Sequence, residues 1–86
     1  MNAVAIEARL HAALDPAEIE VHDDSAQHAG HAGAREGAHF SVRLRCARFV
    51  GLSRLARHRL VYDALGPLMP QGIHALAIDA RAPDED

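Results

Sequence analysis

Two stretches of the chain have the apolar spacing of amphipathic helices. From residue 3 to residue 14 apolar side chains recur every three or four positions, and Asp15-Pro16 follows, which predicts a helix ending there. Ser53 is placed as the N-cap of a second helix that we expect to end at about Leu65. On a helical wheel its apolar face gathers, within about 120°, Leu55, His58, Val61, Tyr62 and Leu65.

Three other stretches alternate between apolar and polar residues, which is typical of half-buried strands. They are "EIEVH" (18–22), "HFSVRLRC" (39–46) and "IHALAIDA" (73–80). The order helix, strand, strand, helix, strand predicts an α+β fold. The last residues, 82–86, form an acidic tail without apolar periodicity, and no repeat or linker divides residues 1–86. We therefore expect one domain.

The order of the elements also predicts how the strands pair. The first two strands are consecutive and should be antiparallel, whereas the crossover through the second helix should make the second and third strands parallel. The end of the first strand and the starts of the other two then share one edge of the sheet. That edge collects the long loop at 24–38, His39 and His74.

Histidines are the candidate ligands at this edge. The stretch "DDSAQHAGHAGAREGAHF" (23–40) contains His28, His31 and His39 among glycines and alanines. Imidazole is a good ligand for iron, zinc or copper, but the same composition also makes a solvated connector. His74, at the mouth of the third strand, is either a ligand or a histidine bonded to a backbone carbonyl. Spacing alone leaves both alternatives open.

The single cysteine, Cys46, limits the chemistry of the chain. It excludes an internal disulfide, a thiolate-only zinc site and an all-cysteine iron–sulfur site built from one chain. Cys46 lies at the far end of the second strand and is expected to be a core residue. His58 is expected to be structural, and His11 and His22 to lie on the surface. No paired acid and base and no activated nucleophile emerges, so we do not expect an enzyme.

The basic residues are concentrated in one part of the sequence, in a chain whose net charge is negative. The net charge is −3, which argues against general affinity for polyanions, yet all nine basic residues are arginines and most lie between Arg43 and Arg59. No apolar segment reaches the length of a membrane span, and no signal peptide begins the chain. We expect a soluble protein of a reducing compartment, the cytoplasm, with no membrane partner.

Several stretches taken together resemble the BolA family from Ile6 to about Pro83. They are "DDS" (23–25) with a histidine three residues after the serine, "GHAG" (30–33), "HF" (39–40), "RFVGLSRLARHRLVY" (48–62) and "IHALAI" (73–78). The resemblance implies an αββαβ fold similar to the class II KH arrangement, with a three-stranded mixed sheet covered on one face by helices.

The resemblance also implies a function. BolA-like proteins pair with monothiol glutaredoxins and share a bridging [2Fe–2S] cluster in iron–sulfur cluster trafficking and iron homeostasis. By motif, His74 matches the cluster-ligand histidine and His28 the second ligand position. The length and glycine content of the loop leave His31 as a rival to His28. A glutaredoxin cysteine and a glutathione thiol would supply the sulfur ligands.

A second implication is a DNA-binding transcriptional regulator that uses residues 53–65. The candidate contacts are Arg54, Arg57 and Arg59, but Arg59 points nearly opposite to the other two on the helical wheel. The Gly-x-x-Gly clamp of RNA-binding KH domains is absent, as is an aromatic platform for stacked bases. A solvated helix flank explains these arginines equally well. The sequence leaves open whether DNA is bound, which glutaredoxin is the partner and whether the isolated chain forms a homodimer.

Overall fold

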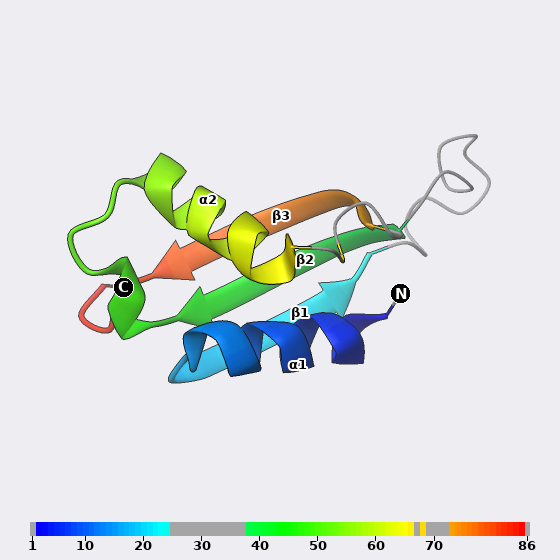
Figure 1. Cartoon of the computed structure of the whole chain (residues 1–86), viewed down its shortest axis with the longest axis horizontal. Helices are drawn as coiled ribbons and strands as arrows, with labels where there is room; N and C mark the ends of the chain where they lie inside the picture. The colour runs from blue at the N-terminus through cyan, green and yellow to red at the C-terminus, as the bar shows by residue number, and fades with distance from the viewer. Residues whose placement is uncertain (1, 25–37, 67, 69–72, 86) are drawn as a thin grey trace.

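The computed structural model of the chain describes residues 2–24, 38–66, 68 and 73–85. Its elements follow one another as α1 (Ala3–Leu14), β1 (Glu18–Asp23), β2 (Ala38–Arg45), the short 3-10 helix η3 (Ala47–Phe49), α2 (Arg54–Leu65) and β3 (Ile73–Arg81) (Figure 1). The strands form one sheet in the order β1-β2-β3. The αββαβ fold is therefore confirmed, with η3 as an element that the sequence pattern did not indicate.

Helix α1 has a defined start and a defined end. The side chain of Asn2 caps the start by accepting a hydrogen bond from the backbone N–H of Ala5 at 2.8 Å. At the end, Asp15 adopts the left-handed conformation, with φ at +48°, which stops the helix. Ile6, Leu10 and Leu14 are buried as their spacing predicted. These three side chains pack the helix against the core residues of the sheet.

The strands pair as predicted. β1 and β2 are antiparallel, from Glu18 opposite Arg45 to Asp23 opposite Phe40. β2 and β3 are parallel, from Ala38 opposite Ile73 to Arg45 opposite Arg81. β2 is therefore the central strand. Its residues 40–45 pair with both β1 and β3, and its first two residues pair with β3.

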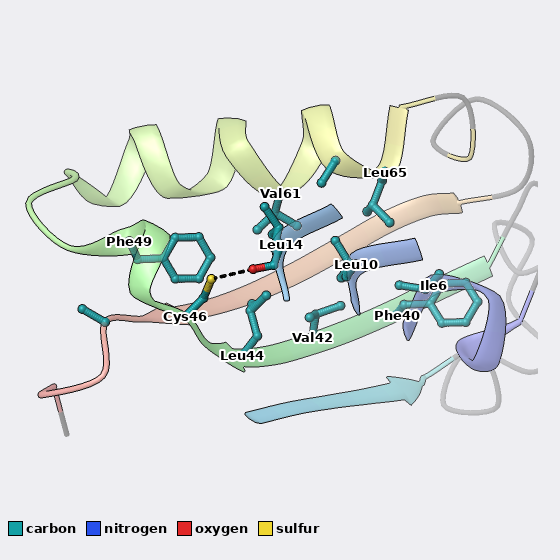
Figure 2. Packing of buried hydrophobic residues seen from close by; sticks show 12 residues of the cluster. Ile6, Leu10, Leu14, Phe40, Val42, Leu44, Cys46, Phe49, Val61 and Leu65 are labelled. Atoms are coloured by element: carbon teal, nitrogen blue, oxygen red, sulfur yellow. Dashed lines mark hydrogen bonds between the residues drawn. The ribbon is translucent and has the colours of Figure 1, made fainter. Parts of the chain in front are cut away.

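The core lies between the sheet and the two helices, which cover the same face (Figures 1 and 2). The alternating side chains of β2 that point into it are all at most 2 % exposed: Phe40, Val42, Leu44 and, just after the strand, Cys46. η3 adds Phe49, which is fully buried. Removing these apolar groups from water is the main favourable contribution to folding.

The buried face of α2 differs from the expected one. The Ser53 cap is confirmed, because its hydroxyl oxygen accepts from the N–H of Ala56 at 3.1 Å. However, Leu55 is 60 % exposed and Tyr62 39 % exposed. The helix instead turns Arg57 inward, with its side chain 13 % exposed. The buried apolar residues of the helix are Val61, Ala64 and Leu65.

The acidic tail is folded back against the sheet. The N–H of Glu85 donates to the carbonyl of Ala82 at 3.1 Å, which closes a turn. Arg45 at the end of β2 donates to the carbonyls of Ala82 and Pro83 at 3.2 and 3.1 Å. The carboxylate of Glu85 pairs with Arg57 of α2. Composition alone predicted only an acidic tail, whereas the tail is bonded to two elements.

Candidate functional site

The end of β1 and the starts of β2 and β3 meet at one edge of the sheet (Figure 1). Asp23 at the end of β1 pairs with Phe40, and Ala38 at the start of β2 pairs with Ile73. His74, the second residue of β3, therefore lies beside the start of β2, as the topology predicted. We call this part of the sheet, with Asp24, His39 and His74, the histidine edge.

The pairing of β2 with β3 shifts by one residue at the histidine edge. Ala38 pairs with Ile73 but His39 pairs with Ala75, so His74 is the extra residue at a β-bulge or irregularity. Bulges interrupt the two-residue alternation of a strand and recur beside functional sites, where they redirect a side chain. The alternation that the sequence predicts for residues 73–80 is therefore interrupted at His74.

Polar groups of β1 and β2 fix the point where the chain leaves the sheet for the long loop. The N–H of Asp24 donates to the carbonyl of His39 at 2.7 Å. The hydroxyl of Ser41 donates to the carboxylate of Asp24. Asp24, His39 and Ser41 are all half-buried. These contacts join Asp24, just after β1, to the first residues of β2 at the histidine edge.

The candidate ligands are described to different extents. His28 and His31 lie outside the described residues, and of His74 the structure describes the backbone and not the side chain. Within the described part of the chain, no three histidine, cysteine or acidic side chains gather into a metal site. The ligand assignments for His74, His28 and His31 therefore stay predictions, with the backbone position of His74 as the structural observation that bears on them.

Cys46 is a core residue, as expected. It is 2 % exposed, and its Sγ lies 3.2 Å from the carbonyl oxygen of Leu14, to which the thiol donates (Figure 2). It follows the C-terminal end of β2, whereas the histidine edge is at the other end of that strand. The donor set therefore fits a cluster only if this chain contributes nitrogen and a partner contributes sulfur.

The remaining histidines have structural or surface positions. Nδ1 of His58 lies 2.9 Å from the carbonyl oxygen of Arg54, one turn earlier in α2. His22 lies on the uncovered face of the sheet, where Nε2 is 3.9 Å from a carboxylate oxygen of Glu20. His11 is exposed on α1.

The face of the sheet that the helices leave uncovered carries charges that pair across the strands. Arg43 on β2 lies between Glu20 on β1 and Asp79 on β3, with N–O distances of 3.8 and 3.7 Å. Arg81 donates two hydrogen bonds to Asp79, at 2.9 and 3.1 Å, and these lower the pKa of that carboxyl. A shallow hollow of about 260 Å³ is lined by Glu20, Arg43 and Asp79 among others. Because its charges are paired with one another, the hollow offers little to a charged ligand.

The three arginines of α2 that were candidates for nucleic-acid contact have different environments. Arg54 and Arg59 are exposed. The guanidinium of Arg57 is bonded to the carbonyls of Leu52 and Ala80 and to the carboxylate of Glu85. A phosphate contact from Arg57 would require the Glu85 pair to open. The sequence pattern does not indicate this pair, because 28 positions separate the two residues and only the fold brings them together.

Comparison with known proteins relates the chain to a family. A family model described as "BolA-like protein" matches residues 10–85. "SufE-like protein 1, chloroplastic/mitochondrial" of Arabidopsis thaliana is 45% identical over 93% of this chain and 23% of its own length. "DNA-binding transcriptional regulator BolA" of Escherichia coli is 41% identical over 85% of this chain and 68% of that protein.

The solved structures agree with these relatives. The BolA domain of SufE1 from Arabidopsis thaliana superposes with a TM-score of 0.85 at 45% identity, covering 98% of this chain and 94% of that one.

The chain spans less than a quarter of the SufE-like relative and about half the length of several other relatives that it matches. In the described residues no helix is long and apolar enough to cross a membrane. The name of the Arabidopsis relative assigns that protein to organelles, so a cytoplasmic location stays a prediction for this chain. The family model, the relatives and the shared αββαβ structure agree, and the chain belongs to the BolA family.

Proposed function

We propose that this chain is a binding protein that partners a monothiol glutaredoxin and shares a bridging [2Fe–2S] cluster with it, in iron–sulfur cluster trafficking and iron homeostasis. The observation that supports the proposal most is the backbone position of His74 at the bulge of the histidine edge, beside the start of β2, where the 24–38 loop ends. No catalytic family is indicated by the similarities, in keeping with a binding role.

The distribution of donor atoms supports a shared site. The only cysteine of the chain is buried at the opposite end of β2 and its thiol is bonded to a backbone carbonyl. A glutaredoxin cysteine and a glutathione thiol would supply sulfur, and His74 with His28 would supply nitrogen, with His31 as the rival of His28. Neutral imidazole in place of thiolate reduces the negative charge around such a cluster and raises its reduction potential.

The test is reconstitution of a cluster on a mixture of this chain, a monothiol glutaredoxin and glutathione. We expect a heterocomplex whose visible absorption and circular dichroism differ from those of the glutaredoxin homodimer. His74→Ala should abolish the difference, and either His28→Ala or His31→Ala should alter it. His22→Ala, on the uncovered face, is the matched histidine control and should leave the spectra unchanged. Unaltered spectra for His74→Ala would show that this histidine is not a ligand.

A second candidate function is DNA binding in transcriptional regulation. It is favoured by the name of the Escherichia coli relative and by the exposure of Arg54 and Arg59 on α2. Phosphate contacts release counterions, so the logarithm of the binding constant should fall with the logarithm of salt concentration by about one unit per phosphate contacted. An electrophoretic shift titrated with salt measures this slope. Loss of binding on Arg54→Ala and Arg59→Ala would support the candidate, and unchanged binding would exclude these contacts.

A further inference from the structure

The guanidinium of Arg57 is oriented by the main chain. Its Nε donates to the carbonyl of Leu52, just before α2, at 3.0 Å, and its Nη1 donates to the carbonyl of Ala80 in β3 at 3.2 Å. The side chain is only 13 % exposed, so few other orientations are open to it. These two bonds do not involve the tail. The guanidinium would therefore keep its direction if the tail moved away.

The two outer nitrogens of Arg57 hold the carboxylate of Glu85 in a two-pronged pair. Nη2 donates to Oε2 at 2.8 Å, and Nη1 donates to Oε1. The N–H of Ala82 donates to the same Oε1 at 2.9 Å. An arginine fork together with a backbone N–H is the arrangement that proteins use to bind carboxylate and phosphate oxygens.

A second arginine, Arg45, donates hydrogen bonds to the Ala82–Glu85 turn. Nη1 of Arg45 donates to the carbonyls of Ala82, Pro83 and Glu85, and its Nε lies 3.6 Å from a carboxylate oxygen of Glu18. The hydrogen bond from Arg57 is the largest cause of the lowered pKa of Glu85, and the charge of Arg45 adds to it. Arg45 therefore holds the turn through its backbone carbonyls, whereas Arg57 contacts the carboxylate itself.

We propose that Arg57 forms an oxyanion site that takes a phosphate group, and that Glu85 fills this site from within the same chain. The Ala82–Glu85 turn then blocks this phosphate site as an autoinhibitory plug, on the side of α2 that faces β3. The site is at the opposite end of the sheet from the histidine edge, so this proposal does not depend on the cluster partnership.

The direct test compares the phosphate affinity of the wild type, Glu85→Ala and Asp84→Ala. Asp84 is the matched control, because it is an exposed carboxylate in the same turn. A ligand that must displace a tethered competitor can bind only the molecules in which the site is open, so its apparent affinity falls in proportion to that fraction. We therefore expect Glu85→Ala to bind phosphate roughly tenfold more tightly than the wild type. Asp84→Ala should resemble the wild type.

Inorganic phosphate is the first probe, and binding is followed by nuclear magnetic resonance of the arginine Nε–H groups at low salt. Adding Arg57→Lys to Glu85→Ala keeps the charge but removes the fork, and it should reverse the gain. A short DNA duplex is the second probe. A gain for both probes supports a general phosphate site, and a gain for the duplex alone supports a site for nucleic-acid phosphates. Equal affinities for the wild type and Glu85→Ala, with both probes, would overturn the proposal, as would a gain that persists without the fork.

Discussion

Arg57 joins three segments of the molecule at the scale of a single residue. Its guanidinium bonds the turn before α2 through Leu52, the edge strand through Ala80 and the tail through Glu85. The pair raises the pKa of Arg57 and holds the pKa of Glu85 at about 2, below its ordinary 4.5. The largest cause for Glu85 is the hydrogen bond from Arg57, followed by the bond from the Ala82 N–H.

The lowered pKa predicts how stability depends on pH. A carboxyl whose pKa is depressed by folding stabilises the protein above its unfolded pKa, and this contribution is lost as the pH falls toward the folded value. The wild type should therefore melt at a higher temperature than Glu85→Gln at neutral pH, and the difference should shrink between pH 4.5 and about 2. Thermal melts followed by circular dichroism measure it. Asp84→Asn should show no such difference, and a gap between the wild type and Glu85→Gln that is independent of pH would contradict the prediction.

At the scale of the elements, α1 could be predicted from its sequence, whereas the buried face of α2 could be predicted only in part, at Val61 and Leu65. In α1 the large apolar residues Ile6, Leu10 and Leu14 fall on one buried stripe, with Val4 as the exposed exception, so periodicity identifies the face. In α2 the apolar residues Leu55 and Tyr62 lie outside the core, while Arg57 is half-buried against β3 and the tail. A partner distant in the sequence, Glu85, makes the inward position of a charged residue favourable. Periodicity within the helix carries no information about that partner.

Because the buried face of α2 differs from the predicted one, substitutions of two leucines in this helix should change the free energy of unfolding by different amounts. Leu65 is fully buried, so Leu65→Ala should reduce the free energy of unfolding by about 2–5 kcal/mol. Leu55 is 60 % exposed, so Leu55→Ala should change it by no more than about 0.5 kcal/mol. Urea unfolding of the two variants measures both values. Equal losses would mean that α2 packs with the face expected from its wheel.

At the scale of the whole molecule, the order of the elements was enough to predict the sheet and the edge where the candidate site lies. Strand directions follow from the connections, because a loop between consecutive strands and a helical crossover favour different pairings. The bulge at His74 did not follow, since a register shift depends on how β3 settles against β2. The docked tail was missed for a similar reason, since Ala82–Glu85 has no pattern of its own.

The bulge gives the proposed ligand site a positional test that leaves composition unchanged. Exchanging two neighbours, by His74→Ala together with Ala75→His, moves the imidazole by one residue along β3. Residue 74 is the extra residue of the bulge whereas Ala75 pairs with His39, so an imidazole moved to position 75 leaves the bulge and should no longer reach the shared site. We expect the exchanged variant, mixed with monothiol glutaredoxin and glutathione, to lose the heterocomplex spectra as completely as His74→Ala alone. Retained spectra would mean that the histidine edge tolerates an imidazole at either position, and that the bulge does not determine the ligand.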